Sequence, residues 1–381
     1  MHVTEQVRSV ARSNNEFALD LYGQLRATDT GNLFFSPASI STALAMTYAG
    51  AEGETEQEMA ETLNFDLPED QVHSAFASLM SLLGAPPDES YELRVANRLW
   101  GQEDYGFLPA YLETTRENYG AELAQVDFVN KTGQVRKEIN AWIEEQTNNK
   151  IKDLLPPGSV DRLTRLVLTN AVYFKGKWEH EFDKEATRDA PFTVSPDEQV
   201  EVPLMFQKRK FKYGETAELQ LLEMGYQGQD LSMLLLLPKK VDDLAAIEEK
   251  LSGENLEKWS AGMRKKEVRT YIPRFELTEE FQLNSMLSAL GMPSAFEPGR
   301  ADFSGMNGKK DLYITAALHK AFVDVNEEGT EAAGATGIVM GITSMPTEPT
   351  VFRADHPFIF LIRHDPTGSI LFMGRVTNPR Q

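Results

Sequence analysis

Histidine, cysteine and serine most often perform catalysis or bind metal, and this sequence is poor in the arrangements that such chemistry needs. It has no cysteine, which excludes a thiol nucleophile and a thiolate metal site. Its six histidines include no pair four residues apart, so a helical zinc site is not predicted. His180-Glu181 starts like the zinc-protease motif but lacks the second histidine. No metal or other cofactor is therefore expected.

Serine-based and nucleotide-based chemistry is not predicted either. The sequence contains no Gly-x-Ser-x-Gly elbow, no Gly-x-x-x-x-Gly-Lys-Ser/Thr phosphate loop and no Gly-x-Gly-x-x-Gly nucleotide fingerprint. We therefore do not expect an enzyme. A serine hydrolase stays only as a competing hypothesis, and it needs a motif that is absent.

The segment with the most unusual composition runs from residue 323 to 346. It begins with strand-like Val323-Asp324-Val325, passes through small residues and continues with apolar and β-branched ones. Its composition alone favours a flexible loop of Ala, Gly and Thr. A loop of this length inside a compact protein usually has a functional reason.

The same segment can also be interpreted as a spare β-strand. Side chains alternate between the two faces of a strand, so one face would carry only small groups, at Thr330, Ala332, Gly334 and Thr336. The other face would carry Glu331, Ala333 and Ala335. Small groups can enter an existing sheet without overpacking the layer beneath it. Gly329 can supply the backbone angles at which the segment folds back, so we predict a segment that moves.

The surrounding elements divide into an early helical part and a later part rich in strands. Phe17, Leu21 and Leu25 lie four residues apart on one helical face, and Ser36-Pro37 is typical of a helix start. Short apolar runs of strand length follow at 166–168, 171–174, 231–237 and 358–362. The last run pairs with 370–373 across the turn 365–368. This order predicts an α+β fold with a large, mainly antiparallel sheet.

Composition and charge limit the classes of partner. The 381 residues are 41% hydrophobic and 25% charged, which excludes a disordered chain, and no internal repeat divides residues 1–381 into separate domains. A net charge of −20 disfavours nucleic acid and anionic membranes as partners. The apolar run at 233–237 is too short to span a bilayer. The N-terminus resembles no signal peptide, so the location is cytoplasmic, or secreted after such a segment is removed.

Several separate stretches, taken together, resemble the serpins over nearly the whole chain. They are Asn32 to Ile40, Leu168 to Trp178, His319-Lys320-Ala321 leading into Glu327 to Thr336, Phe352 to Phe358, and Phe372 to Pro379. The resemblance implies the serpin fold in one domain over 1–381, with an exposed reactive-centre loop at about 327–352. The absence of cysteine and of a vertebrate-style signal segment favours a prokaryotic serpin, thermopin or a near relative.

The resemblance also implies suicide inhibition of a serine protease. The protease would attack the reactive bond and form an acyl-enzyme, and the cut loop would then enter the central sheet as a new strand. In the register of the family the reactive bond is Thr343-Ser344, flanked by Met340, Gly341, Ile342 and Met345. The hinge of the loop comprises Glu328, Gly329, Thr330, Glu331, Ala332, Ala333, Gly334, Ala335 and Thr336.

Five further residues match family positions within the sheet. Ser36, Ser39, Asn170 and His319 match the shutter, a polar cluster beneath the strands that must part, and Trp178 matches the breach, where insertion begins. Taken singly, Ser36 is better interpreted as a helix cap, His319 as a core histidine and Trp178 as a core aromatic. The serine and histidine of the shutter are not expected to form a catalytic dyad.

Basic residues restrict the partners further. No Lys or Arg lies between Glu327 and Phe352, which argues against a trypsin-like target. Thr343 after Ile342 favours an elastase-like protease first, and then a chymotrypsin-like or subtilisin-like one. No Lys or Arg lies between Ala27 and Leu93 either, so no heparin-type activator is expected. The basic cluster at 208–210 is predicted to be a solvated turn.

One alternative stays within the same family. A non-inhibitory serpin acting as carrier or chaperone would keep the fold and lose loop insertion. A charged or bulky residue at position 330 would block the first step of insertion, and Thr330 is neither. We therefore favour an inhibitor, and we expect it to be a monomer.

Overall fold

The computed structural model describes residues 3–84, 91–121, 123–330 and 349–380. Its longer helices lie in the first part of the chain, as the sequence predicts. The helices are α1 (Glu5–Thr28), α2 (Pro37–Tyr48), α3 (Gly53–Thr62), α4 (Glu69–Leu83), α5 (Pro109–Tyr119), α6 (Phe128–Gln146), α7 (Leu244–Glu249), α8 (Gly253–Ala261), α9 (Asn284–Leu290) and α10 (Ser304–Asn307). Short 3₁₀ turns cover Lys184–Ala186 and Pro293–Phe296.

The predicted start of the second helix is confirmed. Ser36 is the N-cap of α2, its Oγ accepts a hydrogen bond from the Ser39 N–H, and Pro37 occupies the first helical position. Every residue of α2 is buried, because this helix packs against both sheets of the protein. The capped start fixes where α2 places its serines.

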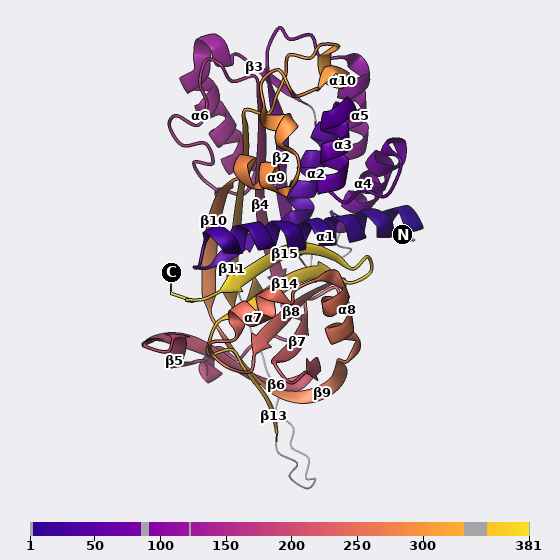
Figure 1. The fold of residues 1–381 in the computed structure, drawn as a ribbon. Coiled ribbons are helices and arrows are strands. Elements are labelled where there is room, and N and C mark those ends of the chain that lie inside the picture. The colour runs from indigo at the N-terminus through magenta and orange to yellow at the C-terminus, as the bar shows by residue number, and fades with distance from the viewer. Residues whose placement is uncertain (1–2, 85–90, 122, 331–348, 381) are drawn as a thin grey trace.

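A six-stranded sheet fills the upper half of the view in Figure 1. Its strands, in spatial order, are β10 (Phe275–Gln282), β11 (Ala316–Asn326), β12 (Gly329–Thr330), β4 (Leu166–Lys177), β2 (Tyr91–Gln102) and β3 (Ala124–Val126). The predicted runs 166–168 and 171–174 form one continuous strand, β4. Helix α6 covers one face of this sheet, and α2 packs on the other (Figure 1).

A nine-stranded sheet forms the other half of the structure. Its strands are β1 (Leu33–Phe35), β15 (Ser369–Val376), β14 (Phe358–His364), β8 (Leu231–Pro238), β7 (Leu219–Gly225), β6 (Glu198–Glu215), β9 (Arg264–Pro273) and β13 (Thr350–Arg353), and β5 (Arg188–Ser195) pairs with β6. Strands β14 and β15 form the predicted hairpin. The β9–β13 pair is parallel, so the sheet is mainly but not wholly antiparallel.

The structure corrects one local prediction. Residues Lys208, Arg209 and Lys210 lie inside strand β6, paired with β9, and not in a turn. Alternation explains the error, because Phe211 and Tyr213 are buried on one side of the strand while the lysines are exposed on the other.

In the described part of the chain, no helix is long and apolar enough to cross a membrane.

Candidate functional site

The centre of the six-stranded sheet contains one parallel pair, β4 with β11, which we call the seam. Its register runs from Val167 opposite Ala316 to Tyr173 opposite Phe322. Parallel pairing is slightly less stable per residue than antiparallel pairing. The hydrogen bonds of the seam should therefore cost less to break than those of an antiparallel pair. A strand placed between β4 and β11 could form an antiparallel pair with each of them.

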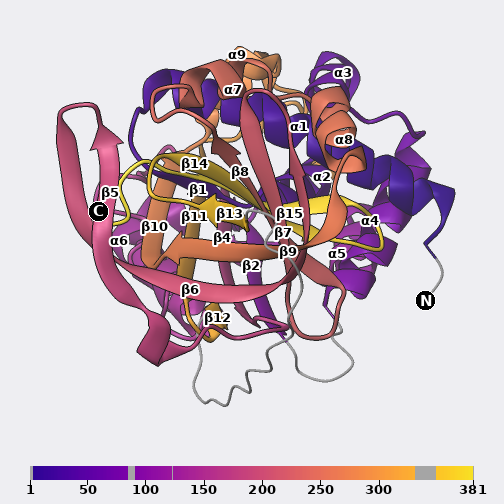
Figure 2. The ribbon, with the colours of Figure 1, turned by 90° about the horizontal axis from the view of Figure 1, so that it is seen from below.

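The two strands of the seam separate at one end, where β12 lies between them. Thr330 pairs with Val325 of β11 and with Gly176 of β4, and both pairings are antiparallel. In Figure 2, which looks onto this end, β12 is seen just below β6. Gly329 and Thr330, which the sequence analysis assigns to the hinge, thus lie between β4 and β11.

Gly329 has a backbone that only glycine can adopt here. Its φ is +146°, and a Cβ at this position would lie 2.1 Å from the carbonyl oxygen of Gly176 and 2.6 Å from the Cα of Lys177. Any side chain would therefore displace β12 from β4. This close approach is a physical reason for glycine at position 329, independent of any movement of the residues that follow.

Beneath the seam, His319 of β11 joins three elements. Its Nε2 accepts a hydrogen bond from the backbone N–H of Ser36 at 3.1 Å, so the ring proton is on Nδ1, which donates to Oδ1 of Asn170. His319 is fully buried, and this burial lowers its pKa to about 3. The imidazole is therefore neutral at physiological pH.

Asn170 of β4 extends the network to α2 and β2. Its amide donates to Oγ of Ser39 at 2.7 Å and to Oδ1 of Asn97. Ser39 in turn donates to Asn97 Oδ1 at 3.0 Å, and Asn97 donates to the Ser39 carbonyl at 3.0 Å. The structure thus brings together all four residues assigned to the shutter and adds Asn97, which the sequence analysis missed. Asn97 stands at an inward position of an alternating strand, and that signal could have identified it.

Ser36 is not placed to act as a nucleophile. Its Oγ donates to the Leu371 carbonyl at 2.7 Å, and only its backbone N–H contacts His319. A Ser–His pair that abstracts a proton needs the hydroxyl on the imidazole. The cluster is a hydrogen-bonded support between the two sheets.

Trp178 lies directly after β4, beside the open end of the seam. Its ring stacks on Tyr226 with centroids 4.7 Å apart, and its Nε1–H donates to the Asn326 carbonyl at 3.0 Å. Its backbone N–H donates to the Glu328 carbonyl at 3.0 Å. Trp178 thus holds the turn between β11 and β12.

The acidic pair that precedes Gly329 is anchored by residues that no sequence signal indicates. The Glu327 carboxylate is buried and accepts from the Arg274 guanidinium, at 2.7 and 2.6 Å, and from Thr187 Oγ1 at 2.6 Å. Burial alone would raise its pKa, but these hydrogen bonds hold the pKa below its usual value. Glu328 forms an ion pair with Lys184.

The opposite face of the seam carries a cationic contact. Lys150, in the connection from α6 to β4, has its ammonium 5.9 Å from the Tyr173 ring and 5.3 Å from the Phe322 ring. These two rings belong to opposite strands of the seam and are register partners. Lys150 therefore contacts both strands at the point where they begin to separate.

Residues 331–348 of the predicted loop lie outside the described residues, whereas its predicted end, 350–352, belongs to strand β13 and is not loop. The range 331–348 contains the hinge residues Glu331, Ala332, Ala333, Gly334, Ala335 and Thr336, the reactive bond Thr343-Ser344, and Met340, Gly341, Ile342 and Met345. The assignments of these residues stay predictions.

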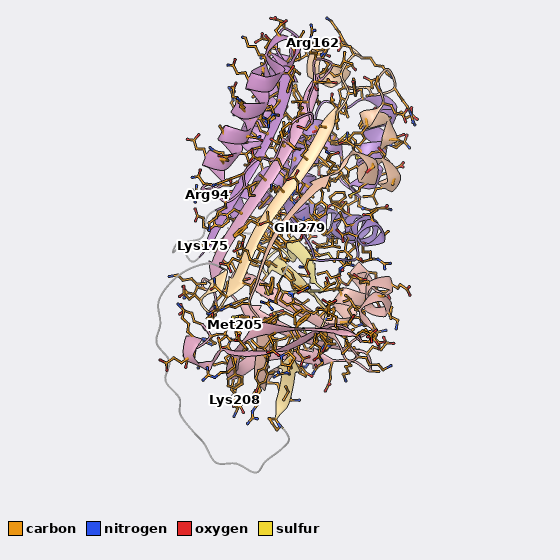
Figure 3. All side chains as sticks on the ribbon, turned by 90° about the vertical axis from the view of Figure 1, so that its left-hand side faces the viewer. Arg94, Arg162, Lys175, Met205, Lys208 and Glu279 are labelled. Atoms are coloured by element: carbon orange, nitrogen blue, oxygen red, sulfur yellow. The ribbon has the colours of Figure 1, made fainter. Side chains whose placement is uncertain are left out.

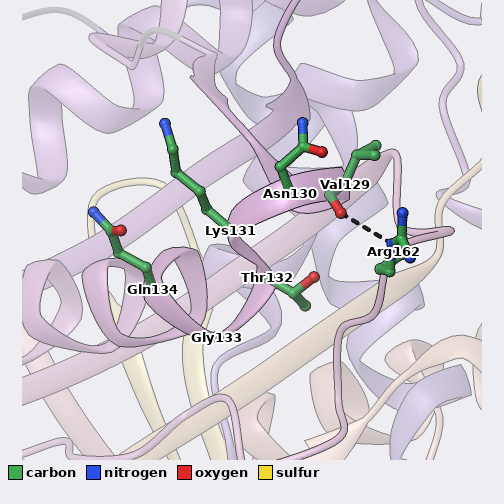
Figure 4. A pocket seen from close by; sticks show the side chains of 7 residues that line it. All are labelled: Val129, Asn130, Lys131, Thr132, Gly133, Gln134 and Arg162. Atoms are coloured by element: carbon green, nitrogen blue, oxygen red, sulfur yellow. Dashed lines mark hydrogen bonds between the residues drawn. The ribbon is translucent and has the colours of Figure 1, made fainter.

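A separate hollow lies at the start of α6, away from the seam (Figure 4). In it, Nε of Arg162 donates to the Val129 carbonyl at 3.2 Å. Its lining residues are Val129, Asn130, Lys131, Thr132, Gly133, Gln134 and Arg162, which include no carboxylate or imidazole that could act as a base. This hollow is not a candidate catalytic site.

The fold and the seam define a protein class, and a family comparison identifies it. The family model described as serpin, serine protease inhibitor, matches residues 12–379. The chain therefore belongs to the serpins, which are protease inhibitors and not enzymes, and the predicted family and α+β fold are confirmed.

Curated relatives match along their full length. The chain is 46% identical to leukocyte elastase inhibitor of Equus caballus, 47% to leukocyte elastase inhibitor A of Rattus norvegicus and 45% to leukocyte elastase inhibitor of Homo sapiens. Each alignment covers 98% of this chain and 100% of the relative.

Solved structures agree with this assignment. Uncleaved ovalbumin superimposes with a TM-score of 0.89 at 34% identity over 97% of this chain and 100% of the other. Serpin48 of the insect Tenebrio molitor gives 0.88 at 33% identity over 99% and 100%. Human thyroxine-binding globulin gives 0.88 at 30% identity over 98% and 99%.

These relatives do not support the expectation of a prokaryotic serpin close to thermopin, since those named here come from vertebrates and an insect. The reason is that the lack of cysteine and of a signal-like N-terminus, on which the expectation rested, is not a property of one lineage.

Proposed function

We propose that this serpin acts as a suicide substrate, whose loop is cut and then enters the seam. A serine protease attacks the carbonyl of Thr343, the bond to Ser344 breaks, and the acyl-enzyme stays attached to the upstream half of the loop. That half extends β12 between β4 and β11. The observation that carries this proposal is β12 itself, which already pairs with both strands at Gly329 and Thr330.

The pairing geometry supports insertion along the whole seam. A strand that continues β12 would replace one parallel pair, Val167–Tyr173 with Ala316–Phe322, by two antiparallel pairs. About a dozen new hydrogen bonds at ~1 kcal/mol each nearly cancel against the ordering of as many residues at ~1–2 kcal/mol each. The net driving force must therefore come from the rest of the fold. In serpins this is strain that the structure stores before insertion and releases when the loop inserts.

The polar network beneath the seam supports the same proposal. His319 and Asn170 lie on the two strands that must part, and hydrogen bonds of side chains re-form readily with new partners. The network can hold the sheet closed and still accept a strand between its members.

The preferred target is an elastase-like protease. Chymotrypsin-like and subtilisin-like proteases are the second choice. Thr343 presents a small β-branched side chain, and the loop offers no Lys or Arg to a trypsin-like pocket. Relatives at 45–47% identity that are named leukocyte elastase inhibitor support this choice. We expect the inhibitor to act as a monomer, without nucleic acid, membrane or a heparin-type activator.

The test is incubation with pancreatic elastase, followed by a denaturing gel and by thermal unfolding before and after cleavage of the loop. A covalent band and a large rise in melting temperature support the proposal. Cleavage without such a rise would instead favour a carrier or chaperone, and turnover of small esters would favour a hydrolase.

A matched pair of variants sharpens this test. Thr330→Arg would put a bulky charged side chain on the strand that must enter between β11 and β4, so it should convert the inhibitor into an ordinary substrate. Thr30→Arg, on an exposed connection outside the sheets, should leave the covalent band unchanged. Equal complex formation by the two variants would contradict insertion between β4 and β11.

A further inference from the structure

Strands β6 and β9 share an exposed face with a concentration of positive charge that is unusual in a chain of net charge −20. On this face lie five cationic side chains, at Lys208, Lys210, Lys212, Lys265 and Arg269, and we call them the basic face. Glu267 is the acidic residue that the two strands place among them. The side chains of Phe211 and Val268 are buried on the opposite side.

The register of these strands places like charges directly opposite each other twice. Lys208 is paired with Arg269, and Lys212 with Lys265. Like charges in such cross-strand pairs destabilise a sheet. These two like-charge pairs therefore lower the stability of the sheet. The chain has 58 acidic residues, yet none of them stands opposite Arg269 or Lys265 on β6.

Neighbouring carboxylates neutralise the basic face only in part. Lys208 forms an ion pair with Glu267 at 2.9 Å, and Lys212 with Glu223 at 2.6 Å. Within the described residues, no carboxylate lies within ion-pair distance of Lys210, Lys265 or Arg269. No carboxylate of the described residues therefore neutralises these three cations.

The basic face lies at the end of the molecule where the chain leaves and re-enters the fold around the reactive loop. Lys208, Arg269 and Val351 form one row across β6, β9 and β13, and Val351 is exposed. Figure 2 shows β6, β9, β12 and β13 together at this end, and Figure 3 places Lys208 near β13 and far from Arg162. A protease bound to the loop between β12 and β13 must sit over this end.

We propose that the basic face is a secondary docking surface for an acidic surface of the target protease. Among proteases that cut the same bond, this serpin would then react faster with those that carry negative charge beside the active site. Charges at the rim of an interface act mainly on the association rate. This inference rests on the inhibitory function proposed above and adds a second determinant of target choice to the reactive bond.

The shape of the basic face favours a protein partner over a polyanion. From Lys208 to Lys212 it extends only ~13 Å along β6. A long polyanion would continue beyond it onto the surface of a strongly acidic protein, whereas a compact acidic patch on a globular protease would match it.

The experiment compares two double variants that change net charge equally. Lys265→Glu with Arg269→Glu neutralises the net charge of the basic face and turns both like-charge pairs into opposite-charge pairs, so folding should be unaffected or improved. Lys137→Glu with Lys309→Glu alters exposed lysines of α6 and of the residues after α10, at the other end of the molecule (Figure 1).

The probe is pancreatic elastase, used native and with its lysines succinylated to make its surface acidic. The readout is the second-order rate constant for consumption of the loop, counted as covalent complex plus cleaved inhibitor. We expect the basic-face variant to react ~10-fold more slowly than the control variant with succinylated elastase at ~50 mM salt. The difference should shrink to ~2-fold or less at ~500 mM salt.

Three results would overturn the inference. They are equal rates for the two variants, a difference that persists at high salt, and a variant that loses retention on a sulfated polysaccharide column while its rates stay unchanged. The last result would assign the basic face to a polyanion. Absence of a covalent complex would contradict the proposed function alone, because loop cleavage still reports docking.

Discussion

Asn170 and His319 are 149 residues apart in the chain, yet they are register partners across the seam and their side chains form a hydrogen bond. Asn170 is also the donor to Ser39 on α2 and to Asn97 on β2. One amide side chain therefore connects three strands and a helix at the point where the central sheet is expected to open.

Replacing Asn170 by leucine should lower the free energy of unfolding by ~1–3 kcal/mol, because it leaves the buried His319 Nδ1–H and the Ser39 hydroxyl short of partners. Urea unfolding measures this loss. Asn97→Leu, at a half-buried position, is the comparison and should cost less. A larger loss for Asn97→Leu would place the centre of the network elsewhere.

The buried neutral His319 should make the protein less stable in acid. Its pKa of about 3 in the folded state is below that of an unfolded histidine, so its contribution is complete above pH ~6.5 and is lost as pH falls towards 3. Denaturant unfolding of the wild type between pH 6 and 4 should include a loss from this residue of ~1.4 kcal/mol per pH unit.

His319→Gln isolates that contribution, because glutamine does not titrate and can still donate and accept. His73, whose pKa burial lowers to about 4, and His364, whose pKa is lowered too, contribute equally to both proteins. The wild type should therefore show the steeper dependence on pH. Identical slopes would mean that His319 is protonated in the folded state.

Gly329→Ala should weaken the hinge. The added Cβ would lie 2.1 Å from the Gly176 carbonyl oxygen at a φ of +146°, so β12 must separate from β4. We expect a loss of ~1–3 kcal/mol in the free energy of unfolding. Thermal and urea unfolding measure it.

The matched control is Gly133→Ala in α6, where a Cβ meets nothing within 4 Å. That substitution should be neutral or stabilising, since alanine favours a helix. Equal effects at both positions would show that β12 is not held against β4 as described.

Arg274→Met should destabilise the base of the loop in a manner that depends on pH. It leaves the buried Glu327 carboxylate without its cation, and because Arg274 is 44% exposed we expect a loss of ~1–3 kcal/mol at pH 7. In the wild type the pKa of Glu327 is below its usual value, so the ion pair stabilises the fold above that usual pKa and loses this effect as pH falls.

In the variant the pKa of Glu327 should rise, because burial is then opposed mainly by the hydrogen bond from Thr187 and no longer by the Arg274 guanidinium. The stability difference between the variant and the wild type should therefore narrow between pH 7 and pH 4. Denaturant unfolding at both pH values provides the measurement. A constant difference would indicate that Arg274 acts through packing and not through charge.

Local features of this protein were predictable from sequence. The cap at Ser36-Pro37, the β14–β15 hairpin and the family resemblance depend on residues close together in the chain. So does the special backbone of Gly329, since a glycine before a run of small residues marks a bend. Such features follow from local propensities and alternation, which operate over a few residues.

The tertiary structure decided what depends on distant segments. The sequence could not show that Glu327 meets Arg274, that Asn97 joins the shutter or that Lys150 lies over both strands of the seam. It also misassigned Lys208, Arg209 and Lys210, because a charged run has the same composition in a turn and on the exposed face of a strand. Strand partners and register are chosen by the packing of the whole chain, and local patterns carry no record of them.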